Sequence, residues 1–160
     1  MKKNLEKIKS RGLEKYAIWA ILFLAAVIRF TGLVKRDFWY DEAFTGVAVK
    51  ESFSSMISMI INDVHPPLYY MALKVFSSFF NYSVYGIRLF SAVFGVLSVW
   101  ALYILAKEMF GEKAARWAAL VTAVSPFAIQ YSQEARMYAM LSFLIFHNIY
   151  FNLNNLSLKL

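Results

Sequence analysis

The chain of 160 residues contains no cysteine, and it is poor in proline, glycine and charged residues. The absence of cysteine excludes disulfides, thiol nucleophiles and cysteine-based zinc sites. There is no linker rich in proline and glycine between soluble domains, and no internal repeat. Hydrophobic residues make up 60% of the chain and the mean hydropathy is +0.50, well above the values of a soluble domain. The composition therefore predicts one membrane-embedded unit over residues 1–160.

The net charge of +7 is explained by where the basic residues lie. Six of the 17 lysines and arginines precede Tyr16, and others flank apolar runs. This pattern is typical of membrane topology and does not favour nucleic-acid binding. We therefore expect residues 1–15 to be a basic leader in the cytoplasm, and no nucleic acid among the partners.

Four apolar runs are long enough, or nearly so, to cross a bilayer as helices. The first rises about 28 Å, close to the roughly 30 Å hydrocarbon core. A cleaved signal peptide is the alternative for this run, but no convincing cleavage site precedes Arg29. We expect Arg29 itself to reach the lipid headgroups by snorkelling, with a role in a buried site as the alternative. The expected spans are residues 16–34, 87–106, 117–131 and 137–153.

The segment 35–86 differs from the spans because it carries charges, paired prolines and clustered aromatics. Residues 53–62 show the apolar spacing of an amphipathic helix, and Pro66-Pro67 suit the start of another helix. The apolar run 68–80 is short for a span. Because the basic loop 107–116 and the leader should both be cytoplasmic, an even number of crossings must separate them. We therefore expect 68–80 to be interfacial or re-entrant, and 35–86 to be an outer loop.

This topology places three polar clusters on the same outer face, with both termini inside. The clusters are Tyr40-Asp41-Glu42, the Asp63 to Pro67 stretch with His65, and Ser132-Gln133-Glu134-Ala135-Arg136-Met137-Tyr138. A carboxylate can take a proton from an acceptor hydroxyl, and an arginine can bind a phosphate and offset leaving-group charge. Aromatic rings such as Tyr138 suit both the interface and the faces of sugars. The clusters together indicate transfer from a lipid-linked phosphosugar.

At these residues the chain resembles the polytopic GT-C glycosyltransferases that use polyprenyl- or dolichyl-phosphate sugars, particularly the protein O-mannosyltransferases and the aminoarabinose transferases. The motifs that carry the resemblance are Asp41-Glu42, His65-Pro66-Pro67-Leu68, the stretch from Arg88 to Gly95, and the Ser132 to Tyr138 cluster. The resemblance implies an all-α polytopic fold of about four transmembrane helices in this portion. It also implies a membrane glycosyltransferase in the plasma membrane, for which a mannose-like sugar is one candidate.

The resemblance assigns roles to individual residues. Asp41 corresponds to the catalytic base, with Glu42 supporting the site or binding the acceptor. Arg136 corresponds to the arginine on the lipid phosphate, and Glu134 to an acidic neighbour that orients it or helps to hold a metal. His65 departs from the aminoarabinose enzymes, which typically have lysine there, so the sugar is not assigned.

Other roles remain open at this stage. Asp63 and His65 either cap the helix that begins at the prolines or belong to the site. Arg88 is expected to be an interface anchor, with contact to the lipid phosphate as the alternative. The carboxylates and the imidazole allow a divalent metal, but no ligand spacing supports one, so cofactors stay unknown.

The resemblance also bears on the extent of the chain. Family members continue through further spans, so we expect this chain to be an amino-terminal portion that a carboxy-terminal partner chain could complete. A non-catalytic four-span protein, binding lipid phosphate or serving as a transporter subunit, is the alternative function. Such a protein would need Arg136 but not Asp41.

Overall fold

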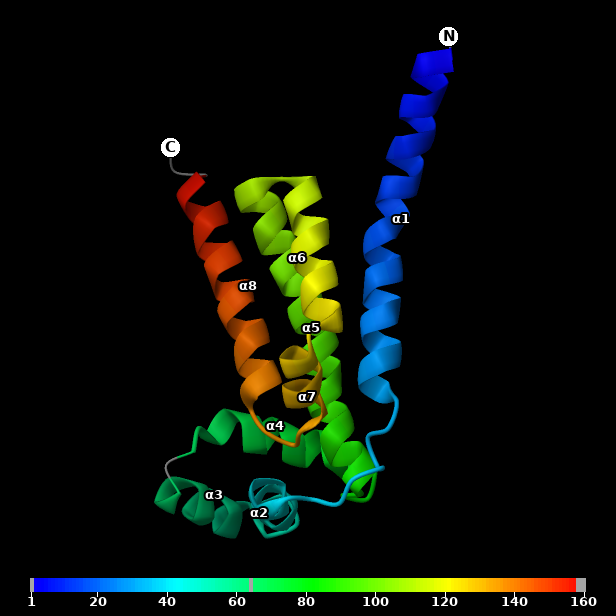
Figure 1. Cartoon of the computed structure of the whole chain (residues 1–160). Helices are drawn as coiled ribbons and strands as arrows, with labels where there is room; N and C mark the ends of the chain where they lie inside the picture. The colour runs from blue at the N-terminus through cyan, green and yellow to red at the C-terminus, as the bar shows by residue number, and fades with distance from the viewer. Residues whose placement is uncertain (1, 64, 158–160) are drawn as a thin grey trace.

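The computed structural model describes residues 2–63 and 65–157, with side chains from residue 16 onward. Over these residues the protein is entirely α-helical (Figure 1). Its helices are α1 (Lys2–Phe30), α2 (Tyr40–Ala48), α3 (Phe53–Asn62), α4 (Pro67–Ser78), α5 (Val84–Phe110), α6 (Glu112–Val124), α7 (Pro126–Gln133) and α8 (Tyr138–Ser157). The all-α prediction is therefore confirmed. The charges of the predicted leader 1–15 lie outside the described side chains.

The helices form two groups at different heights. Helices α1, α5, α6 and α8 run alongside one another, while α2, α3 and α4 lie across one end of them (Figure 1). Both termini and the α5–α6 turn lie at the opposite end (Figure 1). Helix α5 is central, because it packs against α1, α4, α6, α7 and α8. Residues 40–78 are thus gathered at one end of the bundle, as the predicted outer loop requires.

One helix in the described part of the chain, α5, is both long and apolar enough to cross a membrane, with a mean hydropathy of 2.2 over its best window. It extends beyond the expected 87–106 at both ends. Helix α8 begins one residue after the start of the expected 137–153 and extends beyond its end, and the apolar part of α1 ends at Phe30 instead of Val34. The count of four spans stays a prediction.

Two glycines end the long helices. Gly32 follows α1 with φ +80° and Gly111 follows α5 with φ +83°. Only glycine adopts this left-handed conformation at little cost, and it is the usual way to stop a helix. Just after Gly111, Glu112 accepts hydrogen bonds from the Tyr103 hydroxyl at 2.6 Å and from Lys107 at 2.9 Å, and these lower the pKa of its carboxyl.

The expected third span, 117–131, is not one continuous helix. Helix α6 ends at Val124, Ser125 is extended with ψ 122°, and α7 begins at Pro126. Proline has no N–H for the carbonyl four residues earlier, which is that of Thr122. The break therefore leaves the Thr122 and Ala123 carbonyls in need of donors.

Arg29 supplies those donors. Its Nη1 donates to the Ala123 carbonyl at 2.9 Å and its Nη2 to the Thr122 carbonyl at 3.0 Å. Only 1% of its surface is exposed. The prediction that Arg29 snorkels to the headgroups is therefore wrong, because the helix break offers it buried acceptors. The residue fastens α1 to α6.

The crosswise helices share a hydrophobic core with the start of α5. Met56 and Ile60 of α3 are fully buried, as the amphipathic pattern of 53–62 predicts, whereas Phe53 and Ile61 are exposed. Helix α4 begins at Pro67, as the paired prolines predict, and buries two tyrosines and Leu73 against the α5 residues Ile87 and Phe90. This packing holds the polar clusters against the end of α5.

Candidate functional site

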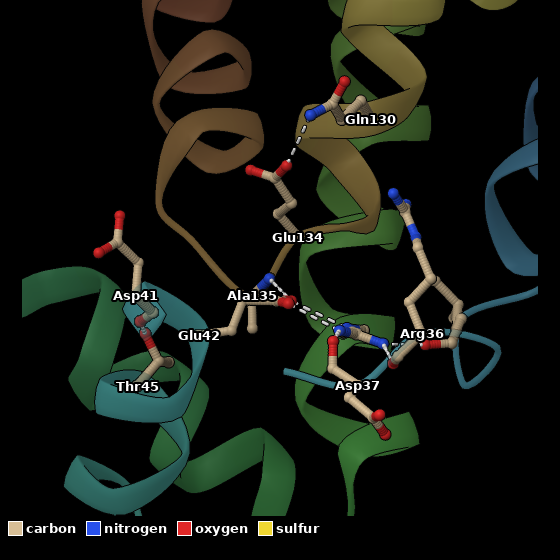
Figure 2. A network of polar contacts seen from close by, with 10 residues as sticks. Arg36, Asp37, Asp41, Glu42, Thr45, Gln130, Glu134 and Ala135 are labelled. Carbon is tan, nitrogen blue, oxygen red and sulfur yellow. Dashed lines mark hydrogen bonds and ion pairs between the residues drawn. The ribbon is translucent and has the colours of Figure 1, made fainter. Parts of the chain in front are cut away.

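The centre of the site is an ion pair between Glu42 of α2 and Arg88 of α5. Arg88 Nε donates to Glu42 Oε1 at 2.8 Å and Nη2 donates to Oε2 at 2.6 Å. Both side chains are almost fully buried. Such a two-point pair fixes orientation as well as distance. Glu42 Oε1 also accepts the backbone N–H of Ala135 at 2.8 Å, so one carboxylate ties α2, α5 and the segment after α7 together (Figure 2).

Arg88 uses all five of its N–H donors within the protein. Two bind Glu42, and the other three bind carbonyls of the connection between α1 and α2, with distances of 2.6 to 3.1 Å. Those carbonyls belong to Leu33, Arg36 and Asp37. The structure places Arg88 in the core of the site, not at the surface position of an interface anchor.

Arg136 is buried as well but uses few of its donors. Its Nη2 lies 2.7 Å from His65 Nε2, and its Nη1 donates weakly to the Asp41 carbonyl at 3.3 Å. The Asp41 carboxylate is 4.0 Å from Nη2. Nε of Arg136 has no partner among the described residues. Arg136 therefore has N–H donors that are not used within the described part of the chain.

His65 links Arg136 to Asp63. Its Nδ1 lies 2.7 Å from the Asp63 carbonyl and 3.0 Å from the Asp63 carboxylate, and both of these can only accept. Arginine can only donate, so His65 Nε2 must accept from it. The contacts thus assign the neutral ring with its proton on Nδ1. The ring packs against both Phe44 and Tyr70, each with a centroid distance of 6.0 Å.

Two tyrosines of α4 lie beneath these side chains. The Tyr69 hydroxyl is 3.0 Å from Ser91 Oγ, which donates to the Arg136 carbonyl at 3.2 Å. Burial raises the pKa of both Tyr69 and Tyr70. These hydroxyls are therefore neutral donors and acceptors, not bases.

One face of α5 fits against the end of α7 and the segment that follows it. The residues at the i, i+3 and i+7 positions of the Arg88 stretch, namely Arg88, Ser91 and Gly95, all lie on this face. A Cβ at Gly95 would be 2.3 Å from the Cβ of Ser132. The Arg88 to Gly95 stretch and the Ser132 to Tyr138 cluster, which are separate motifs in the sequence, thus pack against each other.

The Ser132 to Arg136 segment divides its contacts among several elements. The Gln133 amide lies 3.0 to 3.3 Å from three carbonyls at the end of α1. The Glu134 carboxylate accepts from the Gln130 amide at 3.0 Å and makes no contact with the Arg136 side chain in the described structure (Figure 2). Tyr138 is exposed and packs on Tyr131 with ring centroids 5.0 Å apart.

Asp41 and Glu42 are neighbours with different surroundings. The Glu42 side chain is 2% exposed, whereas that of Asp41 is 39% exposed and points away from the pair (Figure 2). Of the predicted site residues, the structure gathers Asp41, Arg136, His65 and Asp63 into one group. It places Glu42 and Arg88 beside them as a second group, with Glu134 lining the same cavity as this pair, and Tyr138 apart from both groups.

Sequence reasoning gave no role to Gln130, Gln133, Ser91 or Lys74. Lys74 donates to the Val49 and Glu51 carbonyls at 2.8 and 2.6 Å, which satisfies the end of α2. Gln130 could have been found, because it lies four residues before Glu134 on a helix, a spacing that brings side chains together. The other three pair with residues remote in sequence, which no local pattern reveals.

A cavity of about 200 Å³ opens beside the Glu42–Arg88 pair, lined by polar side chains from the α1–α2 connection and from α7. No three histidine, aspartate or glutamate side chains come together as a metal-ligand set within the described part of the chain. The structure therefore adds no support for a metal, and the question stays open.

Comparison with known proteins gives the following matches. The sequence model for the family described as dolichyl-phosphate-mannose-protein mannosyltransferase matches residues 64–157. A protein of Bacillus subtilis (strain 168) called "Putative mannosyltransferase YycA" is 36% identical over 78 residues, which is 49% of this chain and 11% of that protein. The chain thus matches a small part of that relative's length. No solved structure matches it significantly.

Proposed function

Because the chain belongs to the dolichyl-phosphate-mannose-protein mannosyltransferase family, we propose that it carries the base and the phosphate-binding arginine of a membrane glycosyltransferase. The donor is a polyprenyl-phosphate sugar with a mannose-like ring. The acceptor oxygen forms a bond to the anomeric carbon while the bond from that carbon to the phosphate oxygen breaks. Asp41 takes the acceptor proton, and the polyprenyl phosphate leaves against Arg136.

The observation that carries this proposal is the contrast between the two buried arginines. Arg88 has all five donors occupied, so it has none left for a ligand. Arg136 has an unpartnered Nε and lies beside the partly exposed carboxylate of Asp41. An arginine binds a phosphate through two parallel N–H donors. This supports Arg136 as the phosphate ligand and gives Arg88 a positioning role.

The carboxylates of Asp41 and Glu42 differ in the same way as the two arginines: one has its hydrogen bonds occupied within the protein and the other does not. Glu42 is committed to Arg88 and to the Ala135 N–H, which leaves it little capacity to accept a proton from a substrate. Asp41 has only a loose contact with Arg136 and is open to solvent. We assign Asp41 as the base and Glu42 as the residue that fixes the site. His65 and Asp63 then position Arg136.

The membrane setting of the proposal rests on the long apolar helix α5 and on the family. The site lies at the end of the bundle opposite both termini (Figure 1), so termini held in the cytoplasm by the basic leader would put the site on the outer face of the proposed plasma membrane. The matched relative is far longer than the aligned stretch. Further helices, on this polypeptide or on a partner chain, would complete the acceptor groove.

The experiment compares Asp41→Asn with Arg136→Gln. Transfer is followed with polyprenyl-phosphate-linked radiolabelled mannose in membranes, and binding with polyprenyl phosphate in detergent. Asp41→Asn should keep binding and lose about 10²- to 10⁴-fold in transfer rate, since it removes a general base. Arg136→Gln should weaken binding by about tenfold or more, since it removes charge-assisted hydrogen bonds.

Two results would contradict the proposal. Transfer at the wild-type rate in Asp41→Asn would remove the assigned base, and with intact binding it would favour the non-catalytic lipid-phosphate protein. Unchanged phosphate binding in Arg136→Gln would remove the assigned phosphate ligand. Arg88→Lys is not a suitable control, because it breaks the contacts that hold the site together.

A further inference from the structure

Helix α8 has one face against the bundle and one face that is exposed. It lies at the edge of the bundle away from α1 and packs mainly on α5 (Figure 1). Phe143 of α8, for example, packs on Phe94 of α5 with ring centroids 5.6 Å apart. The inner face consists of buried or half-buried residues spaced four, three and four apart, namely Ala139, Phe143, Phe146 and Tyr150.

A second stripe with the same kind of spacing lies on the exposed face of α8. Its residues are spaced four, three, four and three apart, and every one of them is exposed: Leu141, Ile145, Asn148, Asn152 and Asn155. We call this stripe the exposed seam. Such alternation of three and four places side chains in one line that packs against a neighbouring helix. Helix α8 therefore has the pattern for two neighbours, and α5 is one of them.

The exposed seam is polar at a depth where a lipid-facing surface is apolar. In the proposed membrane setting α8 begins at the outer face with Tyr138. Asn148, ten residues later, then lies about 15 Å along the helix, near the middle of a hydrocarbon core of roughly 30 Å. Asn152 lies about one turn deeper. Carboxamides at this depth find no partner in lipid, and in transmembrane helices such side chains bind other helices.

The two asparagines satisfy each other only in part. Asn152 Nδ2 donates to Asn148 Oδ1 at 2.9 Å, and this is the one side-chain hydrogen bond that either residue makes within the described part of the chain. A carboxamide has two N–H donors and a carbonyl oxygen with two lone pairs. Both N–H groups of Asn148 and the carbonyl oxygen of Asn152 are therefore left for a neighbour.

Helix α1 shows the contrast with a surface suited to lipid. From residue 16 to its end, the exposed positions of α1 are all apolar or aromatic. They carry no carboxamide, and they include the large side chains of Trp19, Phe23 and Val27. The exposed seam of α8 therefore differs from a lipid-facing helix surface of the same bundle.

The occupant of the exposed seam must offer hydrogen-bonding groups at the depth of Asn148 and Asn152. A second copy of the chain does so, because it crosses the membrane in the same direction and carries the same asparagines at the same depth. Around a two-fold axis along the membrane normal, each residue of the seam meets its own counterpart. Carboxamides suit such a contact, since each one both donates and accepts, whereas identical charges would repel.

We propose that the exposed seam of α8 is the surface through which two copies of the chain pair in the membrane, as parallel helices joined at Asn148 and Asn152. The pairing rests on the membrane setting of the proposed function. It does not depend on Asp41, on Arg136 or on the transfer reaction.

Cysteine cross-linking in membranes tests the pairing, since the chain has no cysteine of its own. A disulfide requires Cα atoms within about 7 Å of each other. With copper phenanthroline as the oxidant, Leu141→Cys and Ile145→Cys should each give a product of twice the mass of the chain. Phe23→Cys is the matched control and should give none. Phe23 is an exposed apolar residue seven positions from the end of α1, just as Ile145 is seven positions from the start of α8.

Substitution of the asparagines tests their part in the pairing. The dissociation constant is measured by Förster transfer between labelled copies that are diluted with lipid. Asn148→Leu and Asn152→Leu should each raise it by about three- to tenfold, which is the effect of losing a hydrogen bond between transmembrane helices. Asn148→Gln keeps a carboxamide and should restore most of the association. Asp41→Asn should pair like the wild type, so that a failure of pairing and a failure of transfer are distinguished.

Three results would overturn the proposal. The first is the absence of the double-mass product from both Leu141→Cys and Ile145→Cys, which would mean that a different helix or lipid covers the seam. The second is an equal yield of that product from Phe23→Cys, which would indicate random collision. The third is a wild-type dissociation constant in both leucine variants.

Discussion

Adjacent carboxylates, Asp41 and Glu42, acquire opposite properties from their surroundings. Successive residues on a helix point about 100° apart, so one of the two faces the interior and the other faces the opening of the site. The inner carboxylate forms a desolvated pair with Arg88, and the outer one remains partly hydrated. The different roles proposed for Asp41, as the base, and Glu42, as the residue that holds the site together, therefore follow from helix geometry.

This difference predicts unequal effects of the same chemical change. Glu42→Gln leaves the buried Arg88 uncompensated and should lower the free energy of unfolding by about 3 kcal/mol. Asp41→Asn should change it by less than about 0.5 kcal/mol. Unfolding of both variants in detergent, followed by circular dichroism, compares them directly. Similar destabilisation by the two substitutions would show that Asp41 is also part of the scaffold.

The tautomer of His65 is a second prediction at the residue scale. Its contacts require a proton on Nδ1 and a free Nε2, because Asp63 accepts and Arg136 donates. The chain has only two histidines, so ¹⁵N-histidine labelling gives few signals, and His147→Gln assigns them. The ¹⁵N shifts of His65 should show a protonated Nδ1 and an unprotonated Nε2. The reverse tautomer would mean that Arg136 is not held by this ring.

At the scale of helices, the break between α6 and α7 is the feature that shapes the site. Pro126 stops α6, so α7 and the following segment change direction before α8 begins. Gln133, Glu134 and Arg136 then contact different parts of the protein. Arg29 compensates the break by binding the Thr122 and Ala123 carbonyls. Arg29 of α1 and Pro126 of α7 therefore act together. The proline interrupts the helix, and the arginine binds the two carbonyls that the break leaves without donors.

A double-mutant cycle tests this coupling. Arg29→Met removes the donors and should destabilise the protein, because two buried carbonyls lose their partners. Pro126→Ala restores an N–H for Thr122, so Arg29→Met should cost less in that background, with a coupling energy of about 0.5–3 kcal/mol. Thermal unfolding of the four proteins provides the measurement. Additive effects would indicate that Arg29 stabilises the protein in some other way.

At the scale of the whole molecule, the arrangement agrees with the parity of crossings inferred from charge. The α5–α6 turn lies with both termini, and α2 to α4 lie at the other end (Figure 1). The predicted clusters at Asp41, His65 and Arg136 consequently meet, although 95 residues separate the first from the last. The topology in a real membrane remains a prediction.

Cysteine labelling checks the topology without background, since the chain has no cysteine. Ser52→Cys and Glu108→Cys are both at exposed positions, the first just before α3 and the second at the end of α5. An impermeant maleimide should label Ser52→Cys in intact cells and Glu108→Cys only after permeabilisation. Ser132 would not serve, because it is 1% exposed. Labelling of both positions from outside would refute the predicted orientation.

Sequence patterns predicted the helical class, the amphipathic helix over 53–62, the helix start at Pro67, and the residues that gather near Asp41. These features depend on local spacing and on charge next to apolar runs. The pairing of Glu42 with Arg88 and the burial of Arg29 were not predicted, since each depends on a partner 46 to 94 residues away. Pro126 indicates the helix break, but the apolar run 117–131 around it favoured one continuous helix.

The Glu42–Arg88 pair has a consequence for biosynthesis. Its partners come from the α1–α2 connection, from α2, from α5 and, through Ala135, from the segment before α8. A ribosome makes these pieces in order, and the last of them emerges only after α1 to α7 have been translated. All the partners of Arg88 itself precede it in the chain, whereas Glu42 gains the N–H of Ala135 only when that residue has been made. The last contact of the pair is therefore made late, and a nascent chain that stalls before residue 135 lacks one hydrogen bond to the buried Glu42 carboxylate.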